Sequence, residues 1–208
     1  GTRHGVAQAG FGLLYCMNKM FGKGMFYDYT GGRTDGNYCS FNKDICGKLG
    51  INTRWGNKGG SGSTKVPQRY GLNCASFVRW SLCNGGMNLC NGGSNGAESM
   101  SSQKFLPGIK SFWIKGGELE RDNNTSVDVI NGKDANTLLR SMKPGDIVYS
   151  NNKSGSNASH VMLIVGIDDI GIWLADNGDR VQRRSYNQFF DRKKVYKFGI
   201  LDDYYNNN

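Results

Sequence analysis

The second half of the chain repeats short apolar segments separated by polar turns, a pattern typical of antiparallel strands. Pro144-Gly145 makes a turn into the first segment, and Asp168-Asp169-Ile170-Gly171 makes a turn between the second and the third. The segments span residues 146–149, 161–167, 172–175, 180–184 and 194–201. We therefore expect them to form one antiparallel sheet.

Apolar residues at helical spacing predict helices elsewhere in the chain. Residues 134–142 should form a short helix with Asp134 as its N-cap, and another helix should begin near Cys74. A third short helix is expected at residues 97–104, and a longer one, weakened by two glycines, at residues 6–21. The expected apolar face of the longer helix consists of Leu13, Leu14, Met17 and Phe21. Helices beside an antiparallel sheet indicate an α+β fold.

Other stretches give weaker signals. Residues 22–72 are rich in Gly, Asn, Ser and Thr, and so long a stretch without a regular pattern indicates either a functional loop or regular elements that the pattern fails to reveal. Aromatic side chains within it, such as that of Tyr29, are candidates for lining a cleft. The residues around His4 should be frayed, and the C-terminal segment 204–208 should be ragged.

Length and composition limit the classes of protein that this chain can belong to. Its 208 residues suit a single domain, here taken as 1–208, which is long enough to bury a substantial core. The chain is 38% apolar with a mean hydropathy of −0.53, and no apolar run approaches the roughly 18 to 20 residues of a membrane span. The first residues do not resemble a signal peptide. These features indicate a globular protein with long loops.

A candidate nucleophile lies in the segment YGLNCASFVRW, residues 70–80. Asn73 is a suitable N-cap, so Cys74 should lie in the first turn of a helix, where the unpaired N–H groups and the positive end of the helix dipole favour a thiolate. A thiolate is the reactive form of cysteine. The alternative is that Cys74 is simply a small buried apolar residue.

A candidate base follows from the scarcity of histidine. The chain has two histidines, and His4 lies close to the first residue, which leaves His160. It begins the apolar segment HVMLIVGI, which is expected to enter the sheet from a polar loop. A purely structural histidine at a strand edge is the ordinary alternative. A cysteine at a helix start together with one usable histidine suits a hydrolase in which His160 deprotonates Cys74.

Three motifs in the same order resemble those of the NlpC family of bacterial cell-wall cysteine peptidases. They are YGLNCASFVRW, LRSMKPGDIVY and SHVMLIVGIDDIGIWLADNG, and the upstream MFYDYTGGRTDG resembles the aromatic and Gly-Gly segment of that family. The resemblance extends from about residue 26 to residue 177. It implies a papain-like fold, with an antiparallel sheet packed against the helix that carries the nucleophile. It also implies hydrolysis of peptide bonds in peptidoglycan stems, typically between γ-D-glutamyl and a diamino acid.

The resemblance assigns further roles to individual residues. A third polar group should fix the tautomer of the histidine, and we assign it to Asp176, with Asn177 as the alternative; Asp176 can also be an ordinary turn residue. The expected substrate contacts are Tyr29, Asn73, Ala75 and Ser159. We expect no cofactor and no metal. The protein should be secreted or associated with the bacterial cell wall.

The motif around the cysteine departs from the family pattern. The usual Asp-Cys-Ser-Gly is here Asn73-Cys74-Ala75-Ser76. The family's carboxylate and hydroxyl are thought to bind the free amino group of the stem peptide, so their loss predicts an enzyme that does not require this amino group. Two alternatives remain: an amidase or endopeptidase of the related CHAP family, and a non-catalytic module that binds cell wall or nucleic acid.

Charge and cysteine content add two further expectations. The net charge is +9, and basic residues concentrate in residues 180–197, which favours anionic wall polymers as partners. The sequence lacks the usual nucleic-acid-binding motifs, so nucleic acid is a weaker candidate. Besides Cys74 there are five cysteines, and disulfides, a zinc site and reduced thiols all remain open for them. They are Cys16, Cys39, Cys46, Cys83 and Cys90.

Overall fold

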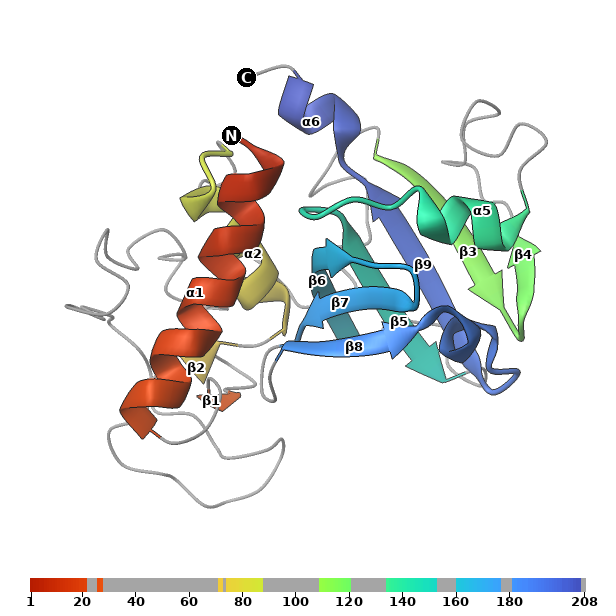
Figure 1. The fold of residues 1–208 in the computed structure, drawn as a ribbon, viewed down its shortest axis with the longest axis horizontal. Coiled ribbons are helices and arrows are strands. Elements are labelled where there is room, and N and C mark those ends of the chain that lie inside the picture. Colours follow the sequence, from red (N-terminus) through yellow and green to blue (C-terminus); the bar gives the residue numbers. More distant parts are fainter. Residues whose placement is uncertain are drawn as a thin grey trace.

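The computed structural model describes residues 1–21, 26–27, 71–72, 74–87, 109–120, 134–152, 160–176 and 181–206. Helices α1 and α2 come early in the chain and most of the strands come later (Figure 1). The helices are α1 (Arg3–Phe21), α2 (Cys74–Asn84), α5 (Ala135–Arg140), the 3-10 helix η1 (Tyr186–Phe190) and α6 (Asp202–Asn206). The strands are β1 (Phe26–Tyr27), β2 (Gly71–Leu72), β3 (Lys110–Lys115), β4 (Glu118–Glu120), β5 (Ile147–Asn152), β6 (His160–Ile167), β7 (Gly171–Ala175), β8 (Val181–Ser185) and β9 (Lys194–Ile200).

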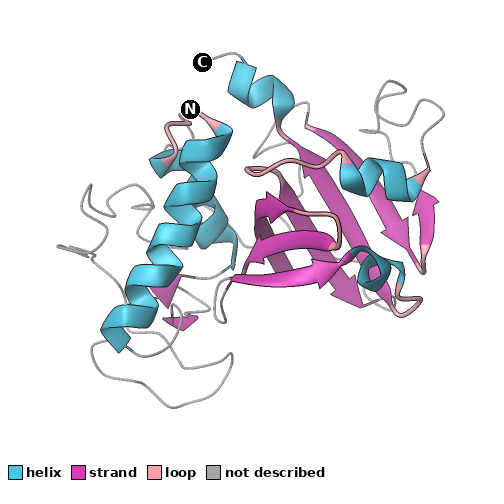
Figure 2. Ribbon diagram, in the orientation of Figure 1, coloured by secondary structure: helices cyan, strands magenta, loops and turns pink. Residues whose placement is uncertain are grey.

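A seven-stranded antiparallel sheet is the centre of the described structure. Its strand order is β4-β3-β9-β5-β6-β7-β8, and every pairing within it is antiparallel. Strands β1 and β2 form a separate parallel pair. Figure 2 shows the helices grouped around this sheet, which is an α+β arrangement.

Both faces of the sheet are buried. Because side chains alternate along a strand, Ile147 and Tyr149 join the core with α1 and α2, whereas Val148 between them joins the core with α5 and η1. The same alternation along β6 sends Val161 and Leu163 to the first core. The uninterrupted apolar run in β6 is therefore explained by burial on two sides.

Helix α1 packs closely on both α2 and β6 because residue 10 is glycine. A Cβ atom at Gly10 would lie 2.6 Å from Cδ2 of Leu163 and 3.1 Å from Oγ of Ser81. The first distance is shorter than real Cβ contacts and the second is tight, so a side chain here would require the end of the Leu163 side chain to shift. Glycine therefore favours the close approach of the three elements. Gly10, one of the two glycines expected to weaken this helix, thus has a role in its packing.

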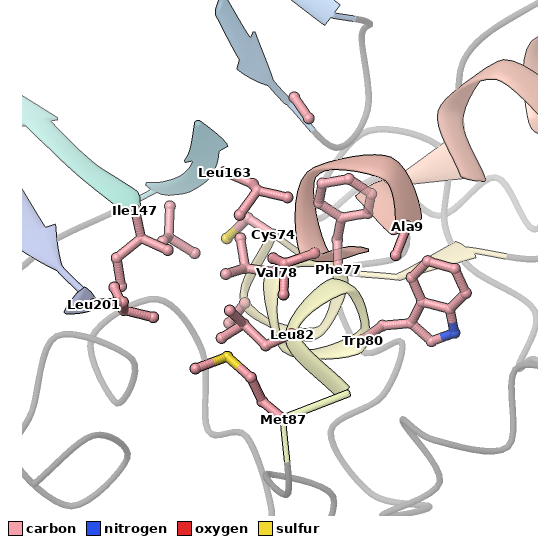
Figure 3. Packing of buried hydrophobic residues seen from close by; sticks show 14 of the residues in the cluster. Ala9, Cys74, Phe77, Val78, Trp80, Leu82, Met87, Ile147, Leu163 and Leu201 are labelled. Carbon is pink, nitrogen blue, oxygen red and sulfur yellow. The ribbon is translucent and has the colours of Figure 1, made fainter. Parts of the chain in front are cut away.

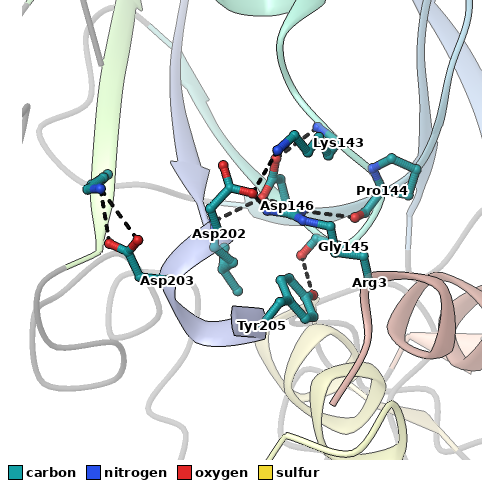
Figure 4. A network of polar contacts seen from close by, with 10 residues as sticks. Arg3, Lys143, Pro144, Gly145, Asp146, Asp202, Asp203 and Tyr205 are labelled. Carbon is teal, nitrogen blue, oxygen red and sulfur yellow. Dashed lines mark hydrogen bonds and ion pairs between the residues drawn. The ribbon is translucent and has the colours of Figure 1, made fainter. Parts of the chain in front are cut away.

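A polar network joins the start of α1 to the end of the chain (Figure 4). The Arg3 guanidinium contacts Asp146 Oδ1 at 2.8 Å and Asp202 Oδ1 at 2.7 Å. Asp146 is 1% exposed, and its Oδ1 also accepts a hydrogen bond from the Leu201 N–H at 2.9 Å. The Tyr205 hydroxyl donates to the Gly145 carbonyl at 2.9 Å. These contacts fix both ends of the described chain against the start of β5.

Two expectations for the chain ends are therefore wrong. Helix α1 begins at Arg3, so the segment around His4 is helical and anchored through Arg3. The C-terminal residues up to Asn206 form α6, in which Tyr205 is buried. In both places the ordering contacts come from residues far away along the chain.

Several local predictions are confirmed. The Asp134 side chain accepts a hydrogen bond from the Thr137 N–H at 2.7 Å and caps α5. Gly145 has a φ of 91°, which suits the glycine of a turn into β5. The hairpin of β6 and β7 and the strands β8 and β9 also occur where expected. The predicted short helix at 97–104 and the long loop at 22–72 lie mostly outside the described residues.

Candidate active site

Helix α2 begins at Cys74, as expected from the sequence. The apolar residues that follow, including Phe77 and Val78, belong to the same buried cluster as Leu163 of β6 (Figure 3). This packing fixes the start of α2 against the sheet. Cys74 is 3% exposed and does not form a disulfide.

His160 is the first residue of β6 and lies opposite Ser150 of β5. Its side chain makes a hydrogen bond with that of Cys74. The His160 side chain is 27% exposed, so the ring is more open to solvent than Cys74. Residues 74 and 160, far apart along the chain, thus meet where the start of α2 approaches the start of β6.

Asp176 lies directly after β7 and contacts the other side of the histidine. Its Oδ1 is 2.6 Å from His160 Nε2, and its side chain is 15% exposed. Because Nε2 faces Asp176, Nδ1 is the ring nitrogen left for the thiol. A distance of 2.6 Å is short even for a charge-assisted hydrogen bond between nitrogen and a carboxylate oxygen. Cys74, His160 and Asp176 form a continuous chain of hydrogen bonds.

The charges and hydrogen bonds around His160 favour the protonated form of its ring. Burial alone lowers the pKa of His160, but hydrogen bonds and charge interactions with Asp176 and Cys74 outweigh it and raise the pKa to about 10. At neutral pH the ring is then an imidazolium whose Nε2–H donates a hydrogen bond to Asp176 Oδ1. A neighbouring imidazolium stabilises a thiolate. The arrangement can therefore hold a nucleophilic sulfur beside a proton donor.

Of the other predicted site residues, the structure describes only Ala75. Ala75 is fully buried, side chain and backbone alike, so the structure shows no surface of this residue that is open to a substrate. Tyr29, Asn73 and Ser159, and also Asn177, lie outside the described residues. The side chains of the five cysteines other than Cys74 also lie outside them, so disulfides and zinc stay open.

Sequence reasoning missed Gln182 of β8. Its Nε2 donates to Asp176 Oδ2 at 3.4 Å, on the oxygen that does not face His160. Residue 182 lies opposite Leu174, two residues before Asp176, so alternation directs both side chains to the same side of the sheet. The register of β7 and β8 would have indicated this contact.

The basic run at 180–197 is partly neutralised within the protein. Arg183 bonds Asp168 Oδ2 at 3.2 Å and lies over the Trp173 ring. Lys197 is buried with its Nζ 5.1 Å from the centre of the Trp113 ring. The described part of this run is therefore not a uniformly solvated basic face.

Comparison of the chain with models of protein families, with curated proteins and with solved structures finds no match. Within the described ranges, no helix has both the length and the apolar character needed to cross a membrane. The same ranges contain no cluster of three or more His, Cys, Asp or Glu side chains that could hold a metal ion.

Proposed function

We propose that this protein is a cell-wall hydrolase of the NlpC type with a papain-like fold. It cleaves peptide bonds in peptidoglycan stem peptides, between γ-D-glutamyl and a diamino acid. The observation that supports this most is the hydrogen-bonded chain of Cys74, His160 and Asp176, contributed by α2, by β6 and by the end of β7. A nucleophile, a base and a group that orients the base are the minimum set for a thiol hydrolase.

The proposed reaction proceeds in two steps. The Cys74 sulfur attacks the carbonyl carbon of the peptide bond, and the electron pair of the C=O bond moves to the oxygen. When this tetrahedral intermediate collapses, the C–N bond breaks and His160 gives its proton to the leaving amine. Water then attacks the thioester and gives one proton to His160. When this second tetrahedral intermediate collapses, the C–S bond breaks, the thiolate is restored and the carboxylic acid leaves and loses its proton to solvent.

Two features near Cys74 would stabilise the negative charge on oxygen in both steps. The first N–H groups of an α-helix have no partner within the helix, and Cys74 is the first residue of α2. The positive end of the helix dipole is at the same place. Donors of this kind lower the barrier most when they are already aimed at the developing oxyanion.

The net charge of +9 suits an enzyme that works in a wall containing anionic polymers. Such attraction concentrates the enzyme at its substrate and weakens as the salt concentration rises. Secretion or attachment to a bacterial cell wall belongs to the same proposal.

The decisive experiment is digestion of purified peptidoglycan followed by mass analysis of the fragments. We expect the wild-type protein to release fragments cut within the stem peptide, and Cys74→Ala and His160→Gln to release none. His4→Gln is a matched control, because His4 is exposed on α1 and should be replaceable. Fragments cut between muramic acid and alanine would indicate the CHAP-type amidase instead. Undiminished release by Cys74→Ala would refute the thiol mechanism.

The form of the substrate follows from the residue before the nucleophile. Asn73 carries no charge, so it lacks the counter-charge for an amino group that the family carboxylate is thought to provide. We expect intact sacculi to be digested at least as well as a free stem tripeptide. Asn73→Asp should shift the preference toward the free tripeptide. A strong preference of the wild-type protein for the free peptide would contradict this expectation.

A further inference from the structure

We propose that Gln182 is a positioning residue, which holds the Asp176 carboxylate in the orientation that places one of its oxygens against His160. The inference rests on the proposed hydrolase function, because Gln182 acts only through the Asp176–His160 pair. It concerns a residue on β8 that lies outside the three motifs on which the family resemblance rests.

The two oxygens of Asp176 have different partners. Oδ1 is 2.6 Å from His160 Nε2, and Oδ2 accepts from Gln182 Nε2 at 3.4 Å. A carboxylate can rotate about the bond that joins it to its Cβ, and this torsion is broad. With donors on both oxygens the plane of the carboxylate is fixed, so Oδ1 stays directed at the ring.

The sheet holds the donor in place. Asp176 follows Ala175, which pairs with Val181, and Gln182 is the next residue of β8. The backbone pairing of β7 and β8 therefore sets the distance between the amide and the carboxylate. Strand β8 is the last strand in the order of the described sheet, so the sheet supplies this donor from its edge.

The relative lengths of the two contacts predict the size of the effect. A contact of 3.4 Å is longer than an ordinary N–H···O hydrogen bond and therefore weak, whereas 2.6 Å is short. Loss of Gln182 should therefore cost much less than loss of Asp176. A single hydrogen bond to a side chain corresponds to about a two- to tenfold effect, or up to about one unit in the pKa of His160.

The test is an NMR titration of the histidine rings in the intact protein. The chain has two histidines, and exposed His4 serves as the internal reference. Gln182→Met keeps the length of the side chain and removes the donor, so the pKa of His160 should fall by up to about one unit. Arg183→Ala is the matched control, since Arg183 on the same strand bonds Asp168 instead.

A double-mutant cycle separates positioning from a general structural role. In an Asp176→Ala background, Gln182→Met should cause no further change in the titration of His160. An unchanged titration in the single Gln182→Met variant would overturn the proposal, and so would an equal change in the Asp176→Ala background. The titration needs no substrate, so it remains decisive even if the wild-type protein fails to cut peptidoglycan. Where hydrolysis is measured, Gln182→Met should lower kcat about two- to tenfold with little change in KM.

Discussion

Replacement of Asp176 by asparagine removes the negative charge beside His160 while keeping the shape of the side chain. The pKa of His160 is raised from 6.5 to about 10 by Asp176 and Cys74 together, against the opposing effect of burial. A rise of this size corresponds to about 5 kcal/mol between the two protonation states of the ring. If the carboxylate supplies about half of it, the variant should have a His160 pKa near 8.

The expected loss depends on pH in a characteristic way. In the proposed mechanism the imidazolium is the form that donates the proton to the leaving amine, so activity should fall as the pH rises through the pKa of His160. At pH 9 about nine-tenths of the wild-type rings are protonated but only about one-tenth of the Asp176→Asn rings. At pH 7 both are mostly protonated. The ratio of wild-type to variant activity should therefore grow about tenfold between pH 7 and pH 9.

The assay is the pH dependence of kcat/KM for peptidoglycan digestion, with the NMR titration of His160 as the independent measurement. The variant His4→Gln should leave both curves unchanged, because His4 is exposed on α1. An Asp176→Asn variant that kept its alkaline limb near pH 10 would show that Asp176 is not what holds the proton on His160. The same result would assign the raised pKa to the thiolate alone.

Two further variants test the packing that carries the site. Arg3→Ala leaves the buried carboxylate of Asp146 without its cation and should cost about 3 to 5 kcal/mol in the free energy of unfolding, measured by denaturant titration. The control Lys115→Ala removes an exposed ion pair and should cost less than about 1 kcal/mol. Equal losses in the two variants would contradict the reasoning. Gly10→Val forces a side chain against Leu163 and should cost about 1 to 3 kcal/mol, whereas an unchanged midpoint would show that α1 can shift away from the sheet.

Local signals predicted much of the structure. The Asp134 cap and the Pro144-Gly145 turn depend on neighbouring residues, and both occur where the sequence indicated them. The apolar run of β6 was also recognisable, because burial on two faces leaves few polar positions in a strand. Cys74 and His160 stood out because histidine is scarce in the chain and the cysteine begins a helix.

Contacts between distant segments explain what the sequence did not predict. Helix α6 is ordered through Tyr205 and Asp202, whose partners Gly145 and Arg3 are 60 and 199 residues away. Strand β3 pairs with β9 across a similarly long separation, and no local pattern specifies that pairing. The contact of Gln182 with Asp176 likewise depends on the register between two strands. Each of these features requires the assembled sheet before it can be recognised.

Because Cys74 is buried, a thiolate at this residue needs charged neighbours to stabilise it. Cys74 is 3% exposed and belongs to an apolar cluster, and burial of this kind disfavours a thiolate. A cysteine in those surroundings alone would be inert. The His160 imidazolium opposes this effect of burial by stabilising the thiolate. The Asp176 carboxylate, 2.6 Å from the ring and directly after β7, keeps the imidazolium protonated. In the proposed mechanism the reactivity of Cys74 therefore depends on His160 at the start of β6 and on Asp176 after β7. Substitutions at these two residues should alter the reactivity of the thiol without changing Cys74 itself.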